Sequence, residues 1–194
     1  MKEILYSLFL SLLTILTSAD IAMATWIITP IDNRSVGQTS VVLDKSGKVH
    51  ISYWDYDNEN LKHASNASGS WMIETIPIQT KNEKFSNLAI DVYDNLHICY
   101  ISNYKFIHAT NASGQWVSEI VSDNYWGPIS IATDSIGNIH AIQGNNYVTN
   151  TFGSWISERI IFGGFGNNSI AIDSDGKVHI SYFSDYPNYN LMYV

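Results

Sequence analysis

The amino-acid sequence predicts an all-β protein made of repeated units, each with four short antiparallel strands. One pattern of 14 residues recurs four times along the chain of 194 residues. Part of this pattern alternates strictly between apolar and polar residues, which is typical of a half-buried strand. No segment shows the periodicity of an amphipathic helix. With 45% hydrophobic residues, the composition also excludes a disordered chain.

The repeated pattern begins at Ser40, Asn87, Ser130 and Ser169. The four copies read SVVLDKSGKVHISY, NLAIDVYDNLHICY, SIATDSIGNIHAIQ and SIAIDSDGKVHISY. In each copy an aspartate precedes a histidine by six residues; the pairs are Asp44 and His50, Asp91 and His97, Asp134 and His140, and Asp173 and His179. A second pattern follows the first three copies and contains Trp71, Trp116 and Trp155. Four matches at this density indicate structural repeats.

The first unit shows how each strand is predicted. An apolar run over 40–43 ends in an Asp-x-x-Gly turn, because aspartate binds its own backbone and glycine tolerates a positive φ. Residues 49–53 alternate as a second strand, and a third lies around 61–65. An Asn-Ala-Ser-Gly turn then leads into a fourth strand over 71–76. Units of roughly 40–45 residues with four such strands are the signature of β-propeller blades.

The two ends of the repeated region suggest how the propeller closes. Residues 25–31 match 70–76 and predict a fourth strand without a blade of its own. The last unit supplies only three strands and ends at 191–194. We therefore expect four blades, the last completed by the N-terminal strand, which leaves no open edge and favours a monomer. The alternative is a partial arc of a larger propeller, which oligomerisation would complete.

Residues 1–24 have the layout of a secretory signal peptide. Lys2 is followed by an apolar stretch over 4–16, and Ala22-Met23-Ala24 offers a cleavage site. The apolar stretch is shorter than the ~20 residues of a membrane span, although an uncleaved anchor is the alternative. The expected propeller domain is 25–194, located outside the cell, in the periplasm or on the cell surface, without membrane attachment after cleavage.

The repeat resembles a known family. The pattern S-[IVL]-A-[IL]-D-x-x-G-x-x-H-I-x-Y, followed by N-L-K-x-A and G-x-W, is similar to a tandem β-propeller repeat of exported bacterial and archaeal proteins. More loosely, it resembles the BNR or sialidase-like propeller superfamily. The resemblance implies a secreted or cell-surface propeller. The turn over 65–71 is only similar to the sialidase Asp-box, because Ser68 stands where that box has Asp.

Composition and motifs narrow the functions that we expect. The net charge of −8, without a basic run, argues against nucleic acid as a partner. Beyond the predicted signal peptide, the chain has only Arg34 and Arg159, too few for the arginine cluster that holds a sialidase substrate. No nucleophile, phosphate-loop or zinc-protease motif occurs in the sequence. We therefore expect a binding module rather than an enzyme, with no cofactor. A sialidase-like or lyase-type glycan-processing enzyme is the alternative.

The repeated histidines and the single cysteine are predicted to be structural. His50, His97, His140 and His179 occupy one position of the repeat, where a ring of metal ligands is conceivable. Their recurrence on the second strand instead favours a structural hydrogen bond to a neighbouring backbone group, so no metal site is predicted. Cys99 aligns with Ser52 and Ser181 and is expected to be a small buried residue.

The loops that do not repeat carry the candidate binding residues. Aromatic residues interleaved with Asn and Asp suit stacking on a sugar, or anchoring of an extracellular protein partner. For Trp54, Tyr125 and Trp126, the alternative role is packing between blades. The candidate ligand-binding residues are Trp54, Asp55, Tyr56, Asp57, Tyr125, Trp126, Tyr186 and Tyr189.

Overall fold

The computed structural model describes residues 26–77, 85–123, 127–160, 167–184 and 189–194. The predicted signal peptide, 1–24, lies outside these residues. The chain divides into two units, Met1–Pro30 and Ile31–Val194, and all the described strands belong to the second. None of the described residues forms a helix long and apolar enough to cross a membrane.

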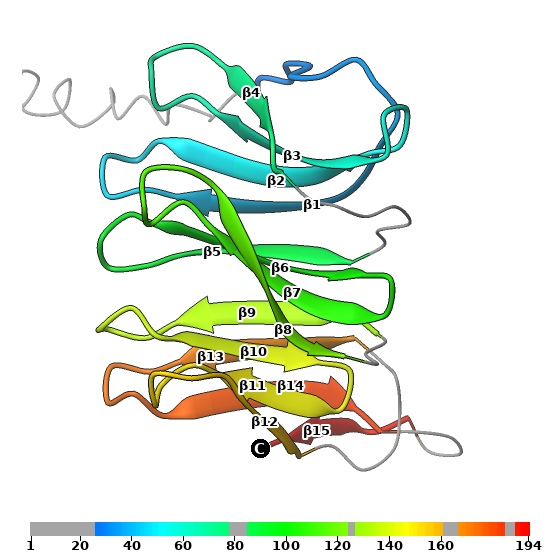
Figure 1. The fold of residues 1–194 in the computed structure, drawn as a ribbon, viewed down its shortest axis with the longest axis vertical. Helices are drawn as coiled ribbons and strands as arrows, with labels where there is room; N and C mark the ends of the chain where they lie inside the picture. The colour runs from blue at the N-terminus through cyan, green and yellow to red at the C-terminus, as the bar shows by residue number, and fades with distance from the viewer. Residues whose placement is uncertain (1–25, 78–84, 124–126, 161–166, 185–188) are drawn as a thin grey trace, which may run out of the picture. The chain divides into compact units, whose positions relative to one another are not determined.

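The described strands form four antiparallel sheets in chain order (Figure 1). The first sheet contains β1 (Val36–Leu43), β2 (Val49–Asp55), β3 (Asn60–Ser65) and β4 (Met72–Thr75). The second contains β5 (Ser86–Ile90), β6 (Leu96–Ser102), β7 (Lys105–Thr110) and β8 (Val117–Asp123). The third contains β9 (Ile129–Thr133), β10 (Ile139–Gln143), β11 (Asn146–Thr149) and β12 (Ile156–Arg159). The fourth contains β13 (Asn168–Ile172), β14 (Val178–Phe183) and β15 (Leu191–Tyr193). The predicted all-β fold of four repeated units is thus confirmed.

Two side chains fix the tight turns in each of the first three units. The backbone N–H groups of Ser46 and Lys48 both donate to Asp44 Oδ1 at 2.8 Å, and Gly47 has a φ of 72°. A glycine suits this turn because a side chain would be strained at that φ. On the next turn, Asn66 Oδ1 accepts a 2.8 Å hydrogen bond from Val49 N–H. The same aspartate and asparagine bonds recur in the second and third sheets.

The hydrophobic core lies between consecutive sheets. The first strands of neighbouring sheets lie side by side, in the order β1, β5, β9 and β13 (Figure 1). One cluster joins Trp54 and Leu61 of the first sheet to Leu88 and Ile98 of the second. Two further clusters join the second sheet to the third and the third to the fourth. Each sheet is therefore held mainly by its neighbours in sequence.

Cys99 lies in the cluster between the second and third sheets and is fully buried, as predicted. Burial disfavours the thiolate and raises the pKa of the Cys99 thiol. The group therefore acts as a small apolar side chain.

The closure of the last blade by the N-terminal strand stays a prediction. The fourth sheet has three described strands, and the described segment Trp26–Pro30 has no strand. The side chains of Trp26, Ile27 and Ile28 are 94%, 88% and 95% exposed. No sheet among the described residues joins β13 to β1. Repeat matching identified a strand-like sequence at 25–31, but it could not show that the β15 edge is paired.

We expect the contacts between sheets to carry most of the stability. Replacing Leu88, which is 3% exposed between the first and second sheets, with alanine should lower the free energy of unfolding by about 2 to 4 kcal/mol. Ile136→Ala, at a turn residue that is 70% exposed, should change it by less than about 0.5 kcal/mol. Urea denaturation measures both variants, and equal losses would contradict this account.

Candidate functional site

A line of polar side chains crosses the first sheet from its inner turn to its outer strand. His50 Nε2 lies 3.6 Å from Asp44 Oδ2, and His50 Nδ1 shares a 3.0 Å hydrogen bond with His63 Nε2. His63 Nδ1 then donates to Glu74 Oε1 at 2.8 Å. The two imidazole rings are stacked, with 5.2 Å between their centroids. We call these four residues the first histidine line.

The second sheet repeats this line almost atom for atom. His97 bridges Asp91, at 3.3 Å, and His108, at 3.0 Å. His108 Nδ1 reaches Glu119 Oε1 at 3.2 Å. We call Asp91, His97, His108 and Glu119 the second histidine line. Two copies with the same partners indicate that the arrangement belongs to the repeat.

The third and fourth sheets contain a shorter version. Here the second histidine is replaced by tyrosine: His140 Nδ1 lies 2.6 Å from Tyr147 Oη, and His179 Nδ1 lies 2.6 Å from Tyr193 Oη. The aspartate contacts are kept, at 3.4 Å for Asp134 and 3.1 Å for Asp173. The predicted structural role of the four repeated histidines fits these bonds. Their partners, however, are side chains and not the backbone groups that were suggested.

The histidine lines also join one sheet to the next. The indole N–H of Trp116, in the second sheet's unit, donates to Glu74 Oε1 of the first at 2.9 Å. Trp155 of the third unit donates to Glu119 of the second at the same distance. Each indole also packs edge-on against a histidine of the preceding sheet. A single carboxylate oxygen thus links a histidine of its own sheet to a tryptophan of its neighbour.

Burial controls the protonation of the histidine lines. It lowers the pKa of His63, His97 and His108, for His108 to about 4, because a buried imidazolium loses its hydration. The adjacent carboxylates oppose this shift without cancelling it. The pKa of Glu74 is lowered by its hydrogen bonds from Trp116 and His63, which outweigh its desolvation. The lowered pKa values therefore keep the imidazoles of His63, His97 and His108 neutral near neutral pH.

The histidine lines do not form a metal centre. Among the residues that the structure describes, no group of three or more His, Cys, Asp or Glu side chains could hold a metal ion. Each imidazole nitrogen named above already faces a carboxylate, a tyrosine or another imidazole.

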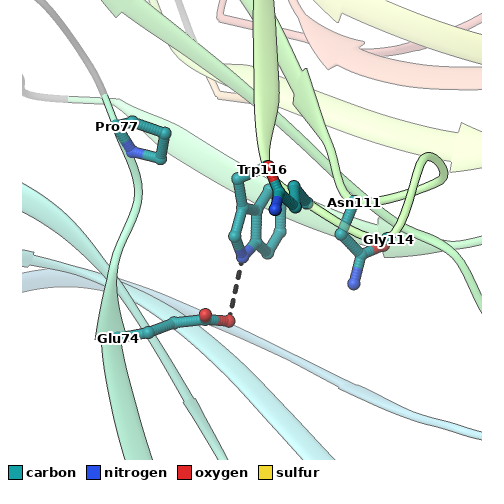
Figure 2. Close-up of a pocket in the computed structure, with 6 residues that line it drawn as sticks. Glu74, Pro77, Asn111, Gly114 and Trp116 are labelled. Atoms are coloured by element: carbon teal, nitrogen blue, oxygen red, sulfur yellow. Dashed lines mark hydrogen bonds between the residues drawn. The ribbon is translucent and has the colours of Figure 1, made fainter.

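A pocket opens where the first two sheets meet at their outer strands. It has a volume of about 350 Å³ and is lined by Glu74, Pro77, Asn111, Gly114, Gln115 and Trp116. Figure 2 shows the Trp116 ring between Pro77 and Asn111, with its hydrogen bond to Glu74. The first histidine line ends at this pocket, because Glu74 belongs to both.

The pocket combines the groups that bind a polar ligand with an apolar face. Glu74 uses Oε1 for both of its hydrogen bonds, and its side chain remains 56% exposed. Asn111 uses Oδ1 to accept from Leu96 N–H, which leaves its amide N–H groups as donors. An indole, a carboxylate and two side-chain amides thus surround a space of the size found for small-molecule sites. Sequence reasoning missed this pocket, since Glu74 and Asn111 come from different repeats.

The structure places two predicted ligand-binding residues in the interior. Trp54 is 5% exposed and belongs to the core cluster between the first two sheets, so packing, the alternative considered for it, is its role. Asp55 is fully buried and accepts hydrogen bonds from Asp57 N–H, Asn58 and Arg34. These contacts correct the prediction for both residues, because neither side chain presents a surface to a ligand. The sequence correctly indicated a loop after the second strand, but Asp55 stabilises that loop through buried hydrogen bonds and does not face a ligand.

The other predicted residues lie on separate sheets or outside the described residues. Tyr56 is 54% exposed on the loop after β2, and Asp57 accepts from Ser35 N–H at 3.0 Å. Tyr189, 61% exposed, precedes β15 in the fourth sheet, so the structure does not bring it next to Tyr56. Tyr125, Trp126 and Tyr186 lie outside the described residues.

Comparison with known proteins identifies the fold and not the activity. No protein-family profile and no curated protein matches the chain. A GH93 α-L-arabinofuranosidase of Fusarium graminearum, solved with arabinobiose, is 13% identical with a TM-score of 0.58, over 82% of this chain and 57% of that one. An α-L-arabinanase of Penicillium chrysogenum is 11% identical with a TM-score of 0.56, over 81% of this chain and 56% of that one. A protein of unknown function from Dyadobacter fermentans is 10% identical with a TM-score of 0.57, over 79% of this chain and 50% of that one.

These likenesses show that the four sheets have the β-propeller fold. The chain spans about half to three-fifths of the length of the structures that it matches. At this level of identity the likeness extends to the fold alone.

The histidine lines predict a pH dependence of stability. Because the pKa values of His63, His97 and His108 are lower in the folded protein than in the unfolded chain, the unfolded chain binds protons more readily below about pH 6.5. The free energy of unfolding should therefore be highest above that pH and fall towards pH 4.5, with His108 alone contributing on the order of 2 kcal/mol.

His108→Tyr copies the pairing of His140 with Tyr147 and should flatten this dependence. His179→Gln, at a side chain that is 37% exposed, serves as the control and should leave it unchanged. Urea denaturation at several pH values provides the measurement. The account fails if wild type and His108→Tyr lose stability equally between pH 7 and pH 4.5.

Proposed function

We propose that this protein is an exported β-propeller module that binds glycans without processing them. The observation that supports this most is the pocket where Trp116 and Glu74 meet between the first two sheets. Its volume of about 350 Å³ suits one or two sugar residues at the end of a chain.

The chemistry of the pocket fits a sugar ring. An indole face packs against the C–H groups of a pyranose or furanose, because both surfaces are flat and apolar. The carboxylate of Glu74 accepts hydrogen bonds from sugar hydroxyls, and charge-assisted bonds of this kind are stronger than neutral ones. The amide groups of Asn111 and Gln115 add donors at the rim. The bond from Trp116 to Glu74 holds the stacking and accepting groups in place before the ligand arrives.

The donor set favours binding over hydrolysis. Most glycoside hydrolases need two carboxyl groups on opposite sides of the scissile bond, about 5 to 10 Å apart. Glu74 is the one carboxylate among the six residues that line the pocket. The arabinofuranosidase and the arabinanase with similar folds were both solved with arabinobiose. This supports a glycan as the class of ligand.

The proposal includes two further points that rest on the sequence: export of the protein, and pairing of segment 25–31 as a blade strand. The signal-peptide layout of 1–24 supports a location outside the cell or on its surface, where glycans are accessible. The match between 25–31 and 70–76 supports a role for the first of these segments as a fourth blade strand. Tyr56, Asp57 and Tyr189, together with Tyr125, Trp126 and Tyr186, remain proposed as loop residues that contact a ligand, each on its own loop.

Titration of arabinose- and hexose-containing oligosaccharides by calorimetry tests the proposal. Wild type should bind at least one of them, and Trp116→Ala should weaken that binding at least tenfold, because it removes the stacking face. Glu74→Gln should weaken it by a smaller factor, since the amide oxygen still accepts a hydrogen bond.

Trp155→Ala provides the matched control. Trp155 makes the same indole bond to a glutamate and the same edge-on contact with a histidine, but one sheet further along. Its loss should therefore have a similar effect on stability while the affinity remains that of wild type. An equal loss of binding in both variants, or no binding by wild type to any sugar, would contradict the proposal.

A further inference from the structure

The pocket between the first two sheets has a carboxylate as its charged group. Among the six described residues that line it, Glu74 is the only ionisable side chain. From this charge, and from the indole that lies beside it, we infer that the glycan bound there has an amino sugar with a free, protonated amine at Glu74. The inference rests on the proposed function and adds to it the chemical class of the sugar.

Within the described part of the chain, no positive charge neutralises Glu74. Its two hydrogen bonds, from His63 at 2.8 Å and from Trp116 at 2.9 Å, both end on Oε1. Burial lowers the pKa of His63, so this imidazole donates without a charge, and the indole N–H is also neutral. No lysine or arginine of the described residues forms an ion pair with Glu74. The carboxylate therefore faces the pocket with its full negative charge.

The lysine beside the first histidine line points to the other face of the sheet. Lys62 pairs with Thr75 across β3 and β4, and His63 pairs with Glu74. Because neighbouring residues of a strand point to opposite faces, Lys62 and Thr75 lie on the face opposite to Glu74. There Lys62 Nζ donates to Thr75 Oγ1 at 2.7 Å and lies 4.0 Å from Asp55 Oδ2. The positive charge of this strand thus balances a buried aspartate and not the pocket.

Glu74 is ionised under the conditions at which a sugar amine is protonated. Desolvation raises the pKa of Glu74, but the hydrogen bonds from Trp116 and His63 outweigh it, so this pKa lies below its ordinary value. A sugar amine resembles an α-amino group, because the neighbouring carbons bear electronegative oxygens, and such amines are protonated below about pH 7. Both charges therefore exist together at mildly acidic pH.

An ammonium group is the donor that this arrangement favours. It forms a charge-assisted hydrogen bond with the carboxylate, which is stronger than the bond from a hydroxyl. Glu74 Oε1 lies 2.9 Å from the indole nitrogen of Trp116, so a cation bound to this carboxylate also lies beside the ring (Figure 2). The faces of an indole attract cations at distances up to about 6 Å from the ring centre. The carboxylate and the indole thus both attract an amine more strongly than a hydroxyl.

The same charge disfavours acidic and acetylated sugars. The carboxylate of a uronic or sialic acid would be repelled by Glu74, and the net charge of −8 adds to the repulsion. An acetylated amine is neutral and forms no ion pair. The amides of Asn111 and Gln115 have no charge, so they bind the hydroxyls of any of these sugars. Selection among the sugars therefore depends on Glu74.

Calorimetric titration of two matched ligands tests the inference. One is a glucosamine oligosaccharide, and the other is the same oligosaccharide after full N-acetylation, so that length and linkage are identical. At about pH 6 and low salt, wild type should bind the free amine about five- to tenfold more tightly, which is the difference between a charged and a neutral hydrogen bond. The preference should decrease as salt is added, because salt screens the ion pair.

Two glutamine variants locate the source of the preference. Glu74→Gln keeps an oxygen acceptor and removes the charge, so it should bind the two ligands with similar affinity. Glu119→Gln is the matched control, because Glu119 accepts the equivalent bonds from His108 and Trp155 and its side chain is 57% exposed. This control removes the same charge at a residue that does not line the pocket, and it should retain the preference of wild type.

The inference is overturned if wild type binds the N-acetylated oligosaccharide as tightly as the free amine, or if it binds neither while another glycan binds; the proposed function stands in both cases. It is also overturned if Glu119→Gln loses the preference as fully as Glu74→Gln, because general attraction between opposite charges would then explain it. If no glycan of any kind binds, the proposed function fails as well.

Discussion

The interaction on which this structure depends is the carboxylate that ends each long histidine line. Glu74 and Glu119 each accept one hydrogen bond from a histidine of their own sheet and one from a tryptophan of the next unit. A carboxylate with two donors is held in one orientation, and its charge strengthens both bonds. The hydrophobic clusters supply the energy that brings the sheets together, while these bonds fix how one sheet is placed on the next.

The same arrangement connects the fold to the proposed ligand site. The Trp116–Glu74 pair that joins the first two sheets also forms one wall of the pocket, so a group that the fold already orders is available to a ligand. The third and fourth sheets end their lines in tyrosine instead, and Glu158 at the equivalent position of the third sheet is exposed. Copies of one repeat thus differ in the side chains that they contact.

The sequence was sufficient to predict the strands but not how the units are arranged. Period-two alternation and the Asp-x-x-Gly turn depend on neighbours in sequence, so the strand positions and the buried Cys99 could be read from the chain. The burial of Trp54 and Asp55 depends on residues more than 20 positions away, such as Leu88 and Arg34. The composition of the loop alone could not show whether these two side chains are buried or exposed. The pocket was missed for the same reason, because Glu74 and Asn111 meet only when two units pack.

A double-mutant cycle across the junction of the second and third sheets tests the central claim directly. Trp155→Phe removes the indole N–H and keeps a ring, and Glu119→Ala removes the acceptor. The effect of Glu119→Ala on His108 is common to both arms of the cycle and cancels. The account predicts a coupling free energy of about 1 to 2 kcal/mol in urea denaturation. A coupling indistinguishable from zero would show that the carboxylate does not hold the sheets in place, and would contradict the account.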